Sequence, residues 1–61
     1  MLEAIIKKLE GEIAMAKANI DVYLENPAGI GEHPDIAGAI ESQIEKIAVA
    51  HEKIQIIEQY L

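Results

Sequence analysis

The 61-residue chain contains no cysteine, tryptophan, phenylalanine, arginine or threonine. Without cysteine it can form neither a disulfide nor a thiolate metal site, which are common supports of very small proteins. Without arginine, and with a formal net charge of −6, it lacks the basic surface that binds nucleic acids or anionic lipids. No run of about 18 apolar residues is present, so we expect no membrane span. We therefore expect neither a nucleic-acid nor a membrane partner.

The start of the chain, "MLEAIIKKLEGE", lacks the basic-then-apolar order of a signal peptide, so we expect a cytoplasmic location. Hydrophobic residues make up 51% of the sequence, chiefly twelve isoleucines and nine alanines. A chain this short buries only about 60% of its unfolded surface. With no disulfide to support so small a core, we expect the chain to associate, first of all with copies of itself.

Apolar residues in the first part of the chain recur in alternating steps of four and three. This heptad spacing places one stripe on one face of a helix and predicts a helix over residues 2–25. The stripe continues across Gly11 without a change of phase, although glycine weakens a helix interior by about 1 kcal/mol relative to alanine. Its members are Leu2, Ile6, Leu9, Ile13, Ala16, Ile20 and Tyr23.

A second stripe at helical spacing predicts a helix over residues 34–60. Pro34 suits the first helical position, where its missing N–H costs nothing, and His33 then falls at the N-cap. Asp35 would lie in the first turn, near the positive end of the helix dipole. The stripe consists of Ile36, Ile40, Ile44, Ile47, Ala50, Ile54, Ile57 and Leu61.

The segment "NPAGIGEHPD" holds both prolines and two of the four glycines. Pro27 ends the first helix, and the glycines permit a reversal, so residues 26–33 are predicted to be the bend of a hairpin. The alternative is a small metal site built from Glu32, His33 and Asp35. We favour the bend and expect no metal or other cofactor, because so narrow a cluster lacks a second histidine.

The fold class is therefore predicted to be all-α: a single domain over residues 1–61, forming an antiparallel hairpin of two long helices. Pairing positions that sum to about sixty places Ile20 opposite Ile40, Ala16 opposite Ile44, and Leu9 opposite His51. We expect this hairpin to associate into a four-helix bundle dimer or a larger oligomer.

Further apolar residues lie off the two stripes and predict the surface of association. On the first helix they form a second line that lies opposite the main stripe. His51, at the margin of the second stripe, is expected to be partly buried and to form a hydrogen bond across the interface. The predicted interface residues are Met15, Ala18, Val22, Val49, His51 and Ile56.

Charge predicts the orientation of the dimer. Residues 17–45, the loop half of the hairpin, carry a formal charge of −5, whereas the half with the two termini carries −1. Loops at opposite ends of a dimer keep the two acidic halves apart, although salt screens this repulsion over about 8–10 Å.

No catalytic constellation is present, and we expect no enzyme activity. Ser42 is the only serine, and neither histidine has an evident place beside it. A di-iron bundle needs Glu three residues before a ligating His, but Ala48 stands there before His51.

The loop "NPAGIGEHPDI" and the helices that flank it resemble short helical-hairpin proteins of marine tailed phages, such as cyanophages. That resemblance implies a phage or metagenomic source, with the protein in the host cytoplasm or in a virion. It implies no activity and no functional residues. The leading hypothesis is a small self-associating structural or adaptor protein. The alternatives are an acidic effector that binds a host protein, and a metal-binding helical bundle.

Overall fold

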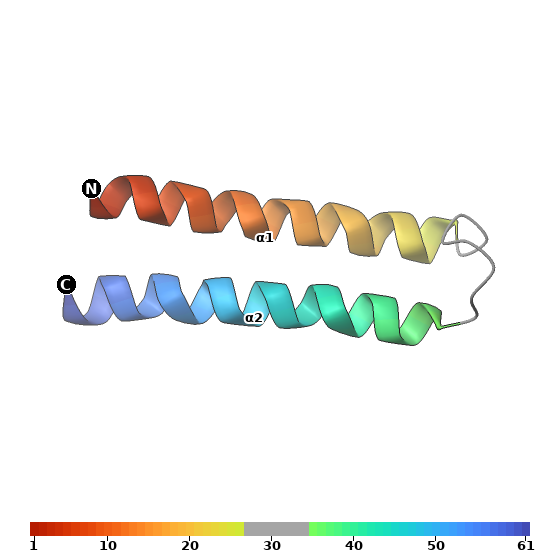
Figure 1. Ribbon diagram of the computed structural model, residues 1–61. Helices are drawn as coiled ribbons and strands as arrows, with labels where there is room; N and C mark the ends of the chain where they lie inside the picture. The colour runs from red at the N-terminus through yellow and green to blue at the C-terminus, as the bar shows by residue number, and fades with distance from the viewer. Residues whose placement is uncertain (27–34) are drawn as a thin grey trace.

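The computed structural model describes residues 1–26 and 35–61. Helix α1 spans Leu2–Glu25 and helix α2 spans Ile36–Tyr60. The two helices lie side by side and run in opposite directions, so the N- and C-termini share one end of the molecule (Figure 1). The prediction of an all-helical antiparallel hairpin is thus confirmed for the described residues. The bend, including Pro27, Glu32 and His33, lies outside the described residues.

Helix α2 begins later than the sequence pattern predicts. Asp35 is its N-cap residue, and the Asp35 carboxylate accepts a hydrogen bond of 2.9 Å from the backbone N–H of Gly38. The prediction that Asp35 lies inside the first turn, after a cap at His33, is therefore wrong. Aspartate is one of the strongest N-cap residues because its oxygen satisfies an N–H that has no partner within the helix.

The seam between the helices follows the heptad stripes, with one shift on α2. Leu9, Ala16 and Ala50 are buried, and so is the polar side chain of Gln43. Ile44, which the predicted stripe includes, is 53% exposed, whereas Gln43 is 7% exposed. The reason is geometric: a step of four from Ile40 to Ile44 breaks the alternation, while Gln43 keeps it.

The predicted pairing of Leu9 with His51 is also wrong within one chain. Ala50 is only 1% exposed and occupies the seam, and its neighbour His51 is exposed. Successive helical residues point about 100° apart, so only one of the two can face α1.

The core of one hairpin is thin. No large side chain is fully buried anywhere in the described residues, and the side chains with the least exposure are two alanines. Eight isoleucines of the stripes are only half-buried: Ile6, Ile13, Ile20, Ile36, Ile40, Ile47, Ile54 and Ile57. Two helices cover each other along one line only, so these isoleucines keep part of their surface open to solvent.

Candidate docking groove

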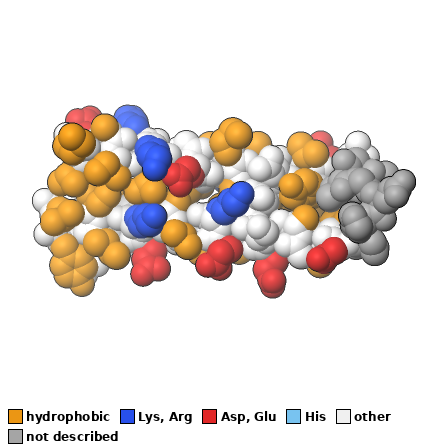
Figure 2. Space-filling model, in the orientation of Figure 1, with side chains coloured by type: hydrophobic (Ala, Val, Ile, Leu, Met, Phe, Trp, Pro, Cys, Tyr) orange, Lys and Arg blue, Asp and Glu red, His pale blue; other side chains and the backbone are white. Residues whose placement is uncertain are grey.

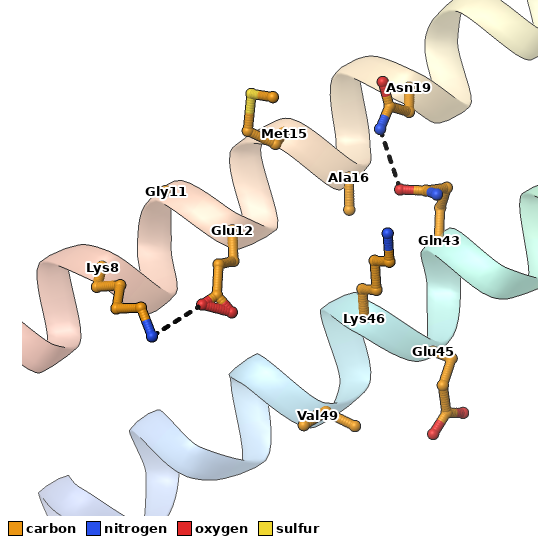
Figure 3. Close-up of a pocket in the computed structure, with 10 residues that line it drawn as sticks. All are labelled: Lys8, Gly11, Glu12, Met15, Ala16, Asn19, Gln43, Glu45, Lys46 and Val49. Carbon is orange, nitrogen blue, oxygen red and sulfur yellow. Dashed lines mark hydrogen bonds and ion pairs between the residues drawn. The ribbon is translucent and has the colours of Figure 1, made fainter.

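An open groove of about 770 Å³ runs along one flank of the seam, near the middle of the hairpin. Ala16 and Gln43 form its floor, and Met15 and Val49 contribute apolar surface from α1 and α2 (Figure 3). A second hollow of about 280 Å³ continues toward the termini and is lined by Ile5, Leu9 and Ile56, among others. Lys8 lines both hollows, so they form one continuous surface along the molecule. We call this surface the groove face.

The heptad repeat explains why apolar side chains gather on this face. Residues seven apart lie on the same side of a helix. Met15 and Val22 are seven apart on α1, and Val49 and Ile56 are seven apart on α2. All four are more than 40% exposed: Met15 68%, Val22 55%, Val49 43% and Ile56 44%. Figure 2 shows hydrophobic side chains concentrated over the end of the hairpin that carries the termini.

Charged side chains cross the groove face between the apolar ones. Lys8 and Glu12 form an ion pair of 3.9 Å on α1, one helical turn apart. Both side chains are well exposed, at 79% and 48%, so the pair contributes at most about 1 kcal/mol. Glu12 and Lys46 extend from their own helices toward the opposite helix (Figure 3). Three of the five lysines of the chain, Lys8, Lys46 and Lys53, line the two hollows.

One side-chain hydrogen bond joins the two helices within residues 1–26 and 35–61. The Asn19 Nδ2 group donates to Gln43 Oε1 over 3.2 Å, at the loop end of the groove. None of the described side chains leaves a buried polar atom without a partner. The sequence pattern did not indicate this pair, although Gln43 is the residue that an unbroken heptad selects.

The six predicted interface residues are all exposed in the single hairpin, and only three line the groove face directly. These three are Met15, Val49 and Ile56. Val22 extends the same row toward the loop. Met15 thus flanks the seam, so the prediction that its line lies opposite the main stripe is wrong for this residue. His51 is two residues from Val49 and therefore points about 200° away, to the other flank of the seam. Ala18 lies on the outer side of α1, and whether these residues contact a partner stays a prediction.

Among the described residues, no three His, Asp or Glu side chains come together in a group that could hold a metal ion. Of the predicted metal cluster, Glu32 and His33 lie outside those residues, and Asp35 caps α2. Neither α1 nor α2 is long and apolar enough to cross a membrane.

The fold and the groove define the class of this protein as an antiparallel helical hairpin with one open apolar face. Comparisons with protein-family models, curated proteins and solved structures found no match to the chain. The resemblance to phage hairpin proteins accordingly stays a prediction.

Proposed function

We propose that this chain is a small, non-enzymatic structural or adaptor protein that acts by associating with copies of itself. Its assembled form would be a four-helix bundle, which is a dimer of hairpins, or a larger oligomer. The resemblance in the loop suggests a phage source and a location in the host cytoplasm or the virion.

The observation that carries this proposal is the mismatch between the buried and the exposed apolar side chains. Within the described residues, only Leu9, Ala16 and Ala50 are buried apolar residues, while Met15, Val22, Val49 and Ile56 lie in the open on one side. Complete burial of such a side chain stabilises a fold by about 1.5–3 kcal/mol. One hairpin gains little of this, and a second layer of helices would supply the rest.

Dilution tests the proposal. If association completes the core, unfolding releases separate chains, and the midpoint of thermal unfolding must rise with protein concentration. We expect the helical circular dichroism signal to melt at a higher temperature at 200 µM than at 2 µM, by roughly 10 °C. Light scattering should give at least twice the chain mass of 6.7 kDa at the higher concentration. A 6.7 kDa particle with the same melting midpoint at both concentrations would exclude a self-associating role.

A further inference from the structure

The opposite flank of the seam forms a second face of the hairpin. This second face is less suited to burial than the groove face. On that second face the positions beside the seam carry charges of both signs, and the large exposed apolar side chains there are Leu24 and Ile44. The charged residues include Glu3, Lys7, Glu10, Lys17 and Glu58. The groove face carries more exposed apolar side chains, drawn from both helices. A partner that covers one face of the hairpin therefore gains most by covering the groove face.

Charge also sets the groove face apart. Its two hollows are lined by Lys8, Lys46 and Lys53 together with Glu12 and Glu45, a formal charge of +1. Since the whole chain carries −6, the remaining residues carry −7. This face is thus the one on which two copies of an acidic chain can approach each other with the least repulsion.

The size of the face suits a second copy. A helix of 25 residues is about 37 Å long, and the hairpin is 15 Å wide, so the flat area is roughly 550 Å². Accessible surface exceeds flat area because side chains project from it. A standard interface buries about 800 Å² on each partner, so a stable dimer needs a partner that covers a large share of this face. A second hairpin, which is equally long, can do so.

The spacing of the residues on the groove face specifies how the second rod lies. Consider a two-fold axis that crosses α1 at the level of residue 10 and relates two hairpins that run in opposite directions. That axis brings Ile5 of one copy opposite Met15 of the other, because these residues are equally distant from residue 10. It also brings Lys8 opposite Glu12, twice by symmetry.

The same axis fits α2 without adjustment. Asn19 lies across the seam from Gln43, so the level of residue 10 on α1 corresponds to that of residue 52 on α2. Val49 and Ile56 lie on either side of that level, almost equally far from it. One axis therefore matches apolar with apolar on both helices and places a lysine opposite a glutamate. The two copies then overlap along residues 1–19 and 43–61, over about 28 Å, and Val22 lies beyond the overlap.

The alternative axis runs along the hairpin and places both loops at one end. It would set α1 of one copy against α2 of the other, with Lys8 opposite Lys53. It would also bring together the two loop halves, each of formal charge −5. Both contacts are repulsive.

We propose that a second copy covers the groove face in the opposite direction, with Lys8 of each hairpin paired with Glu12 of the other and the loops at the far ends. This proposal rests on the proposed function and adds to it the surface, the direction and the register of association. Lys53 lies within about one residue of the axis, so the two Lys53 side chains meet near the centre of the dimer. This contact is repulsive, but the two Lys8–Glu12 pairs and the separation of the two acidic loop halves outweigh it.

A single-cysteine cross-link tests this geometry. Because the chain has no native cysteine, the introduced residue is the only one that can form a disulfide. We expect Lys53→Cys to form a disulfide-linked dimer in air-oxidised buffer, in more than half of the chains. Ser42→Cys, on the same side of α2 but about 15 Å from the axis, should form less than a tenth as much. If the wild-type chain is dimeric by light scattering but Lys53→Cys links no better than Ser42→Cys, the proposed register is wrong while self-association stands. If the wild type is monomeric at 200 µM, both proposals fail.

Exchanging the charges of Lys8 and Glu12 tests the proposed contact between these two residues independently. Lys8→Glu and Glu12→Lys should each raise the dimer dissociation constant about tenfold, because two symmetric pairs become repulsive. The double variant Lys8→Glu/Glu12→Lys restores the pairs and should return the constant to within about threefold of wild type. Additive weakening in the double variant would overturn the pairing.

Discussion

Asn19 donates a hydrogen bond to Gln43 across the seam between α1 and α2, and this pair is the polar layer of an otherwise apolar interface. Gln43 is buried, whereas Asn19 is only half-buried and retains access to water. The pair therefore fixes the helices at one relative position, because any slip along the seam would leave Gln43 buried without a partner. Buried polar residues in helical bundles serve this purpose in some systems, at a cost in stability.

The Gln43→Leu variant tests whether the polar pair lowers the stability of the hairpin relative to an apolar residue at the same position. Leucine keeps the side-chain volume and suits a buried heptad position, and Asn19 can turn to solvent. We therefore expect the free energy of unfolding to rise by about 1 kcal/mol. Urea denaturation followed by circular dichroism measures the change.

A matched control for that prediction is Gln43→Ala, which removes the hydrogen bond without refilling the space. It should lower the free energy of unfolding by about 1–2 kcal/mol. If the leucine variant is less stable than wild type, the polar pair contributes more than apolar burial at this level of the seam.

The N-cap of α2 gives a prediction in which two effects oppose each other. Asp35→Ala should destabilise the protein by about 1 kcal/mol, since the Gly38 N–H loses its acceptor. Gly38→Ala should be close to neutral in the wild type. Alanine favours the helix, but its methyl group would lie 2.6 Å from Oδ1 and 2.7 Å from Cγ of Asp35 and would displace the cap.

A double-mutant cycle measures the coupling free energy between Asp35 and Gly38 at this cap. With the carboxylate already removed, Gly38→Ala has nothing to displace and should stabilise the Asp35→Ala protein by about 0.5–1 kcal/mol. Thermal denaturation of the four proteins at one concentration gives the coupling. Equal effects of Gly38→Ala in both backgrounds would mean that the cap contributes nothing to stability.

Gly11 lowers the stability of α1, and the packing of the single hairpin does not require a glycine at this position. A methyl group there would have no neighbour within 4 Å. We expect Gly11→Ala to raise the free energy of unfolding by about 0.5–1 kcal/mol, through helix propensity and a less flexible unfolded chain. The matched control is Ala18→Gly, seven residues further on the same exposed side, which should lower it by a similar amount. Destabilisation by Gly11→Ala would indicate that the second copy proposed for the groove face, which Gly11 lines, packs too closely on this glycine to admit a methyl group.

The sequence was sufficient to predict the hairpin because its heptad stripes are long and nearly unbroken. Each stripe fixes which side of its helix is buried, and two stripes of equal length have one economical solution. The error at Ile44 arose where hydropathy and spacing disagree. Isoleucine is the more apolar residue, but the geometry of a regular helix places Gln43 at the seam, so spacing decides.

Other features of the molecule depend on contacts that periodicity does not encode. Asp35 could have been identified as the cap from its residue type, since aspartate is preferred there and histidine is not. The groove could not have been predicted from the periodicity, because it arises where Gly11 and Ala16 are small and the neighbouring side chains are large. His51 and Val49 both look like interface residues in the sequence, yet they lie on different flanks of the seam.

A matched pair of substitutions on α2 tests which flank of the seam is covered on association. Each substitution introduces one negative charge, on opposite sides of the helix. Val49 lies on the groove face and is 43% exposed, whereas Ile44 lies outside it and is 53% exposed. Both exchanges replace a β-branched apolar residue with glutamate, which is a good helix former, so neither should disturb the hairpin itself. If association covers the groove face, Val49→Glu buries a charge beside apolar partners and should raise the dimer dissociation constant at least tenfold. Ile44→Glu should leave that constant within about threefold of wild type. Sedimentation equilibrium at several concentrations measures both constants, and a stronger effect at Ile44 would move the interface to the opposite flank of the seam.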